Sequence, residues 1–184
     1  MMSMIRWLPR LQSTSSVLAV LLMFFASVAT GQEGSVAGTR IPACGKPVKG
    51  QSLIGWGKYG LFFSVPKRGV KISGGKPDVD YVKFVIKATN HEAALALWFG
   101  GMAFHPDPPG ETRRSSASFT QTKLLNMDGT EIGLDSRGRK RDTSIWRWFG
   151  VWAEGAEYEN ASAEDAALFD KIIDSACLIP NPNH

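Results

Sequence analysis

The chain has 184 residues, of which 43% are hydrophobic, 21% charged and 10% aromatic. This balance is typical of a globular domain and excludes a disordered, collagen-like or cysteine-rich chain. The formal net charge of +4 falls to +2 without Arg6 and Arg10, which lie in a leader that we expect to be removed. So small a charge gives no reason to predict nucleic-acid binding.

Residues 1–31 have the pattern of a secretory signal peptide. Two arginines precede the apolar run Val17–Phe25, and small residues follow it, so that cleavage after Ala29 or after Gly31 fits equally well. The alternative is a membrane anchor, but the apolar run is shorter than the roughly 20 residues that cross a bilayer. We therefore expect a periplasmic or secreted protein, with no integral membrane span after cleavage.

The two cysteines, Cys44 and Cys177, lie near the two ends of the mature chain. Cys44 follows the apolar run at too great a distance to be the lipidated cysteine of a lipoprotein. In an oxidising compartment such a pair most often forms one disulfide bond, the alternative being two buried free thiols. We predict the disulfide bond, and the wide spacing argues against redox chemistry of the C-x-x-C kind.

The first half of the mature chain predicts an arm followed by strands. Residues 32–58 are rich in Gly and Pro without a sustained period, which indicates an extended N-terminal arm before a domain over residues 59–184. Within Asp80–Thr89, apolar and polar residues alternate as in a half-buried strand. We predict strands over Gly60–Val65, Val70–Ile72, Asp80–Thr89 and Ala93–Phe104.

The second half predicts a long loop and three more strands. His105–Ser118 carries three prolines and a polar run, and loops of this length are usually functional or mobile. Asp128-Gly129 is a hairpin signal. We predict strands over Phe119–Leu125, Glu131–Leu134 and Thr143–Trp152, with a turn around Arg137–Arg141 before the last of them.

The C-terminal segment has the period of a helix. Ser162 and Asp165 resemble a capping box, and the apolar residues that follow recur on one face. Phe169, Ile173 and Cys177 fall on one stripe, which predicts that the cysteine reaches the core from the last turn of the helix. The fold class we expect is α+β, a single domain with an antiparallel β-sheet and a C-terminal helix packed across it.

This order of elements, with Phe63-Ser64-Val65-Pro66 as an early strand of the form F-x-V-P, resembles small secreted domains of the PsbP/MOG1 type. It is also similar to uncharacterised exported bacterial proteins. The resemblance covers Gly60 to Cys177 and implies the same α+β fold. It carries no catalytic residues over to this chain.

Motifs for catalysis are missing from the sequence. Three histidines and a cysteine pair committed to a disulfide make a poor set for zinc, and there is no G-x-S-x-G, P-loop or G-x-G-x-x-G motif. We therefore expect no enzyme activity, metal or cofactor. The alternative is a small cell-wall glycan hydrolase that uses Glu154, Glu157 or Glu159, which follow a tryptophan-rich strand.

That strand contains the most suggestive pattern in the chain. On a strand, Trp146, Trp148 and Trp152 share one face, and Gly150 leaves a gap between two of them. The three indoles either form a stacking platform for sugar rings or fill the core, and tryptophan is highly buried on average. Core packing is the outcome we expect.

A basic cluster, Arg137, Arg139, Lys140 and Arg141, occupies the predicted turn. It is either a solvated loop or a contact for an anionic surface, and Arg113-Arg114 would extend it if both loops lie at one end of the sheet. Taken together, these patterns predict an exported non-catalytic binding or accessory protein of the cell envelope. Its partner would be an unknown envelope component or protein.

Overall fold

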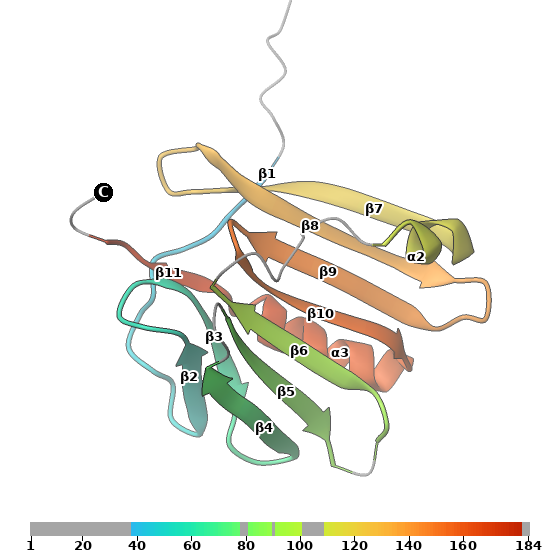
Figure 1. Ribbon diagram of the computed structural model, residues 1–184, viewed down its shortest axis with the longest axis horizontal. Helices are drawn as coiled ribbons and strands as arrows, with labels where there is room; N and C mark the ends of the chain where they lie inside the picture. The colour runs from blue at the N-terminus through green and yellow to red at the C-terminus, as the bar shows by residue number, and fades with distance from the viewer. Residues whose placement is uncertain (1–37, 78–80, 90, 101–108, 182–184) are drawn as a thin grey trace, which may run out of the picture. The chain divides into compact units, whose positions relative to one another are not determined.

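The computed structural model describes residues 38–77, 81–89, 91–100 and 109–181 (Figure 1). The signal peptide predicted for residues 1–31 lies outside this range. The strands are β1 (Gly38–Arg40), β2 (Gln51–Gly55), β3 (Gly60–Pro66), β4 (Val70–Pro77), β5 (Val82–Ala88), β6 (Ala94–Phe99), β7 (Ser116–Leu125), β8 (Glu131–Lys140), β9 (Ile145–Val151), β10 (Glu154–Ala161) and β11 (Cys177–Ile179). The helices are α2 (Gly110–Ser115) and α3 (Ala163–Ile173).

The strands form two sheets. The larger has eight strands in the order β1-β7-β8-β9-β10-β6-β5-β4, and the smaller has three in the order β11-β3-β2. Helix α3 packs on β9 and β10 of the large sheet and on β3 of the small one. The expected C-terminal helix on a sheet is confirmed, but the described chain is mostly β and the strands divide between two sheets where we predicted one.

The core lies between α3, the small sheet and one face of the large sheet. Strand alternation places Leu95, Leu97 and Phe99 on this core face. Phe63 of β3 meets Phe99 and Phe149 edge-on, with ring centroids 6.1 and 6.0 Å apart. The opposite side of the large sheet, here called the second face, carries the alternate residues of the same strands, among them Trp98, Trp148 and Glu157.

Helix α3 forms where the capping pattern predicted it. The Ser162 hydroxyl accepts a hydrogen bond from the Asp165 N–H at 3.1 Å and donates one to the Asp165 carboxylate at 2.9 Å. Phe169, Ile172 and Ile173 are buried beneath the helix. The helix ends at Ile173, so the prediction that Cys177 belongs to its last turn is wrong: Cys177 begins β11.

Three other predictions need correction. The arm of residues 32–58 contains β1 and β2, because both strands find pairing partners that are distant in sequence. The loop predicted over His105–Ser118 contains α2 and the start of β7. The basic turn at Arg137–Arg141 is strand up to Lys140, because β8 pairs with β7 as far as Lys140 and with β9 as far as Arg139.

No helix in the described part of the chain is long and apolar enough to span a membrane.

Candidate binding site

The three tryptophans for which a platform was the alternative to core packing lie in three different environments. Trp146 is fully buried, its indole N–H donates to the Ser116 hydroxyl at 2.8 Å, and its ring contacts Phe119 at 6.2 Å between centroids. Trp148, on the same face, is half-buried. Trp146 is therefore buried on the second face by packing against β7, and the three indoles do not form one row.

Trp152 is the exception, because its side chain is 57% exposed. It lies in the turn after β9, where its N–H donates to the Ile132 carbonyl at 3.1 Å. Its φ angle is +53°, in the left-handed region that a bulky residue rarely adopts. Backbone strain of this kind clusters at ligand-binding sites in proteins.

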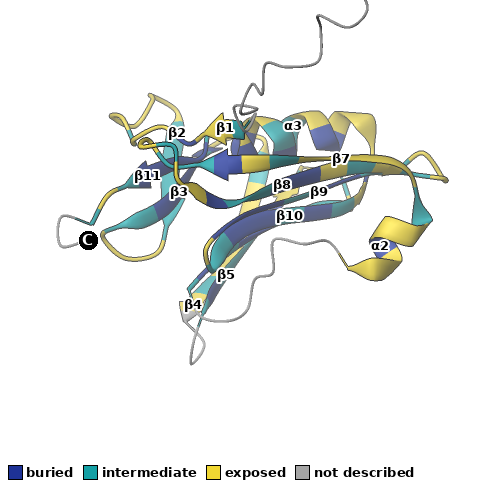
Figure 2. Ribbon diagram, turned by 90° about the horizontal axis from the view of Figure 1, so that it is seen from above, coloured by how far each residue is buried: buried dark blue, intermediate teal, exposed yellow. Residues whose placement is uncertain are grey.

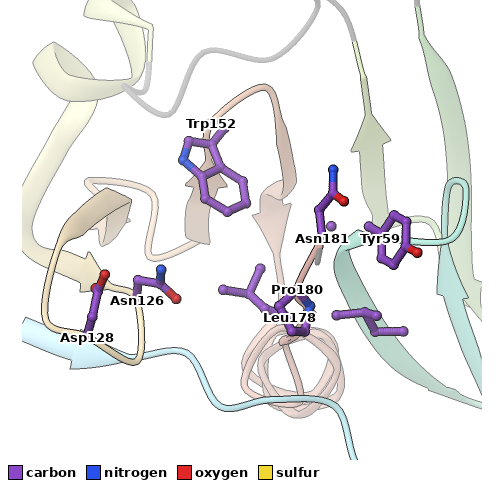
Figure 3. Close-up of a pocket in the computed structure, with 9 residues that line it drawn as sticks. Tyr59, Asn126, Asp128, Trp152, Leu178, Pro180 and Asn181 are labelled. Carbon is purple, nitrogen blue, oxygen red and sulfur yellow. The ribbon is translucent and has the colours of Figure 1, made fainter. Parts of the chain in front are cut away.

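The Trp152 pocket is a cavity of about 750 Å³ beside this indole (Figure 3). Its size lies within the range of small-molecule sites in proteins. Four segments that are distant in sequence line it: the turns before β3, after β7 and after β9, and the chain from β11 onward. The lining residues are Tyr59, Gly60, Asn126, Asp128, Trp152, Leu178, Ile179, Pro180 and Asn181.

Polar side chains stand on two sides of the pocket, Asn126 and Asp128 on one and Asn181 on the other. Figure 3 places Asn126 and Asp128 together, apart from Leu178 and Pro180. Asn126 Oδ1 accepts from the Met127 N–H, and Asp128 Oδ1 accepts from the Thr130 N–H, both at 2.8 Å. Hydrogen bonds from Thr130 lower the pKa of Asp128, so its carboxylate is ionised at neutral pH.

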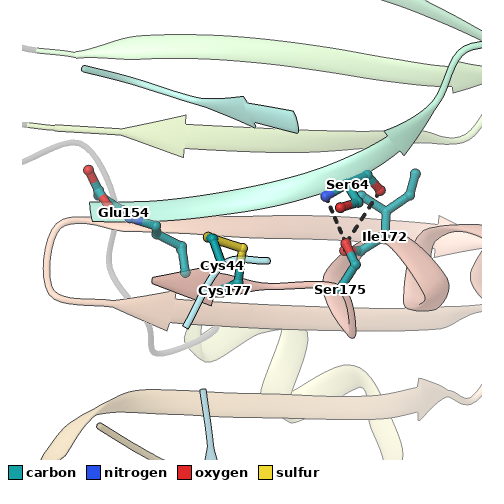
Figure 4. The surroundings of a disulfide bond; sticks show 7 residues. Cys44, Ser64, Glu154, Ile172, Ser175 and Cys177 are labelled. Atoms are coloured by element: carbon teal, nitrogen blue, oxygen red, sulfur yellow. Dashed lines mark hydrogen bonds between the residues drawn. A yellow bond between two sulfur atoms is a disulfide. The ribbon is translucent and has the colours of Figure 1, made fainter. Parts of the chain in front are cut away.

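The disulfide bond between Cys44 and Cys177 holds one wall of the pocket (Figure 4). Beside it, the Leu178 N–H donates to the Pro42 carbonyl at 2.9 Å and the Cys44 N–H donates to the Leu178 carbonyl at 3.0 Å. The disulfide that the cysteine count predicted is thus present, and it ties the segment Leu178–Asn181 to the N-terminal arm.

The Glu154 carboxylate lies against Gly60, one of the residues that line the pocket. Glu154 Oε2 accepts from the Leu61 N–H at 2.6 Å, and a Cβ at Gly60 would lie only 2.8 Å from the same oxygen. Gly60 also has a φ of +107°, which favours glycine. Burial raises the pKa of Glu154, although the bond from Leu61 opposes this. Glu154 therefore has a structural partner beside the pocket.

The other two glutamates, Glu157 and Glu159, lie on the second face. The pKa of Glu157 is raised and that of Glu159 is lowered. Burial raises the pKa of Glu157, although the Trp98 indole and the charge of Lys83 oppose the rise. Burial alone would raise the pKa of Glu159. Hydrogen bonds from Thr112 at 2.6 Å and from Lys140 at 2.9 Å outweigh this effect and lower the pKa. The Lys83 ammonium stands 3.9 Å from the centre of the Trp98 ring.

The four residues of the basic cluster do not lie together in one loop. Arg137 and Arg139 point to the core-face side of β8 and are exposed, while Lys140 points to the second face and pairs with Glu159. Arg141 is exposed in the turn that follows, and its N–H donates to the Ser115 carbonyl at 3.2 Å. This bond brings Arg113-Arg114 of α2 beside the cluster, as the sequence pattern allowed.

Trp152 stands out in the sequence, but the other residues of its pocket do not. The Asp128-Gly129 hairpin signal marked one wall, yet nothing in the local sequence placed it near Tyr59 or Pro180. Within the residues that the structure describes, no group of three or more His, Cys, Asp or Glu side chains is placed to hold a metal ion.

Comparisons of the chain with family models, with curated proteins and with solved structures found no match. The resemblance to the PsbP/MOG1 type therefore stays a prediction.

Proposed function

We propose that this protein is an exported binding protein of the cell envelope that takes a saccharide in the Trp152 pocket. The observation that carries the proposal is a tryptophan held more than half exposed, on a left-handed backbone, over a cavity of about 750 Å³. Exposing an indole forgoes the free energy of burying it, so such an arrangement points to a ligand that covers the ring.

The chemistry of the lining favours a sugar. A pyranose presents axial C–H groups on its faces and hydroxyl groups around its rim. The flat rings of Trp152 and Tyr59 suit the faces, and the side-chain oxygens and amides of Asn126, Asp128 and Asn181 suit the rim. The ionised Asp128 disfavours acidic ligands, so we expect a neutral or amino sugar.

The proposed location rests on two features of the chain. Residues 1–31 have the pattern of a signal peptide, and the Cys44–Cys177 disulfide suits an oxidising compartment. Saccharides of the bacterial envelope would be the ligands within reach there.

The test is isothermal titration of the purified protein with β-1,4-linked N-acetylglucosamine oligomers and with soluble cell-wall fragments. We expect binding that Trp152→Ala weakens by roughly tenfold or more. Trp56→Ala is the matched control, because Trp56 is 42% exposed and does not line the pocket. Binding that both variants weaken equally, or no binding to any member of the panel, would contradict the proposal.

A second candidate function is the hydrolysis of a cell-wall glycan. One observation favours it: Glu157 and Glu159, two residues apart on the same face of β10, have pKa values shifted in opposite directions. Glycosidases use such a pair as a protonated acid and an ionised base or nucleophile. Release of reducing ends from cell-wall glycan that Glu157→Gln abolishes would support it, and wild-type protein that releases none would exclude it.

A further inference from the structure

Five exposed arginines gather at the end of the large sheet where β8 passes into β9. Arg113 and Arg114 lie on α2, Arg137 and Arg139 on β8, and Arg141 in the turn that follows β8. The hydrogen bond from the Arg141 N–H to the Ser115 carbonyl joins the two segments. Figures 1 and 2 show α2 and the β8–β9 turn at this same end, here called the arginine end.

Three of the acidic groups nearby have partners on the protein, and a fourth, Glu111, is exposed on α2. Glu159 pairs with Lys140 at 2.9 Å. The Asp142 carboxylate accepts hydrogen bonds from the N–H and the hydroxyl of Ser144, at 3.0 and 2.6 Å. Asp170, which shares a groove with Arg137 and Arg139, is bound by Arg147. The exposed charge at this end is therefore predominantly that of the arginines.

An exposed apolar ring lies beside one of these arginines on the second face. Phe119 of β7 is 46% exposed, and the Arg113 guanidinium lies 5.9 Å from the centre of its ring. Phe119 pairs with Gly138 and contacts Trp146, so its ring lies on the second face, whereas Arg137 and Arg139 reach the same end of the sheet from the core-face side. An exposed aromatic ring with basic residues near it is typical of surfaces that bind at a membrane interface, where the ring enters the boundary between headgroups and acyl chains.

We propose that the arginine end docks the protein on a membrane surface rich in anionic phospholipid headgroups. A guanidinium binds phosphate oxygens through two parallel hydrogen bonds, so arginine suits this partner better than lysine does. This surface does not include the Trp152 pocket, and the proposal is independent of the saccharide proposed above.

The test is co-sedimentation of the protein with vesicles of phosphatidylcholine alone, or with about one third phosphatidylglycerol. Wild type and variants are all used without the predicted signal peptide, residues 1–31. We expect binding to the anionic vesicles only, lost progressively as salt is added. The double variant Arg114→Glu/Arg141→Glu should weaken binding by roughly tenfold or more.

The matched control is Lys67→Glu/Arg68→Glu, which changes the net charge by the same amount. Both residues are exposed in the turn between β3 and β4, and β4 is five strands from β8, about 24 Å across the sheet. We expect this variant to bind within about twofold of wild type, since its charges lie more than a Debye length away. Phe119→Ala should weaken binding while leaving its salt dependence unchanged.

Two results would overturn the proposal. Equal losses in the two double variants would show that binding follows net charge and not the arginine end. Absence of binding to anionic vesicles, with arginine-dependent binding of a short DNA duplex instead, would assign the surface to another polyanion. The circular dichroism spectrum of each variant establishes that the fold is retained, and none of these results bears on sugar binding.

Discussion

Arg147 of β9 and Asp135 of the neighbouring strand β8 lie diagonally across from each other on the core face and form a bidentate ion pair. The Nε and Nη2 groups of Arg147 donate to the two oxygens of the Asp135 carboxylate, each at 2.9 Å. Arg147 also donates to Asp170 and Asp174 of the α3 segment, so one buried guanidinium joins the sheet to the helix. Burial alone would lower the pKa of Arg147, but these carboxylates raise it, and the group stays charged.

Asp135→Asn should therefore destabilise the protein strongly, because it leaves a buried charge without its main partner. We expect a loss of about 3 kcal/mol or more in the free energy of unfolding. Asp174→Asn removes a carboxylate from the same guanidinium, but its side chain is 61% exposed, so the loss should stay below about 1 kcal/mol. Urea unfolding compares the two, and equal losses would refute the assignment of Asp135 as the principal partner.

Substitutions of Trp146 and Trp152 should differ in their effect on the free energy of unfolding, because one side chain is buried and the other exposed. Trp146→Ala removes a fully buried side chain and should lower the free energy of unfolding by about 3–5 kcal/mol. Trp152→Gly removes an exposed side chain and relieves a left-handed backbone, so stability should be unchanged or higher. Chemical denaturation of both variants checks this, and a severe loss for Trp152→Gly would mean that the indole is held for packing and not for a ligand.

The helix offers a matched pair of neighbouring positions. Ile172 is buried against the sheets, so Ile172→Asp should lower the free energy of unfolding by several kcal/mol. Lys171 is exposed, so Lys171→Asp should change it by less than about 1 kcal/mol. Thermal unfolding of the two variants is the measurement. Similar losses would mean that the buried face of the helix is assigned wrongly.

The disulfide should contribute both stability and binding. Replacing Cys44 and Cys177 together with Ser opens a loop with a sequence separation of 133 residues, and we expect a loss of about 2–5 kcal/mol. Mass spectrometry of the unreduced native protein should detect no free thiol, and two alkylatable cysteines would contradict the bond. Because β11 continues into the pocket wall, ligand affinity should fall in the serine variant as well.

Glu154 should give the stability of the protein a pH dependence that glutamine removes. Burial raises the pKa of Glu154 above the ordinary 4.5, so its contribution to stability is greatest below that value and is lost as the pH rises through the higher folded pKa. Glu154→Gln still offers an oxygen to the Leu61 N–H without a charge. We expect it to be more stable than wild type at about pH 7 and equal to it near pH 4. Unfolding across this range tests the sign, with the exposed Glu131→Gln as the control.

Local signals were enough to predict α3 and the faces of β5. The Ser162–Asp165 cap and the spacing of Phe169, Ile172 and Ile173 lie within a dozen residues of each other, so no distant contact was needed. The alternation in β5 likewise follows from burial on one face only. In both segments the residue pattern and the environment agree.

The length of β8 was missed because its last residues do not look like a strand. Arg137, Gly138, Arg139 and Lys140 carry no apolar alternation, and only pairing with β7 and β9 keeps them extended. The formation of β1 and β2 likewise depends on pairing with other strands. The Trp152 pocket has the same origin, because its four walls meet only when both sheets have formed.

The order in which the chain is synthesised bears on how the small sheet is completed. β3 lies between β2, which immediately precedes it, and β11, which comes from the last residues of the chain. Cys44 leaves the ribosome 133 residues before Cys177, which is roughly 7 to 27 s at ordinary elongation rates. Until then one edge of β3 has no strand beside it and is open to pairing with other chains. A product that stops short of Cys177 would keep that edge open, so β11, the last strand of the described chain, is the one that protects β3 from pairing with other chains.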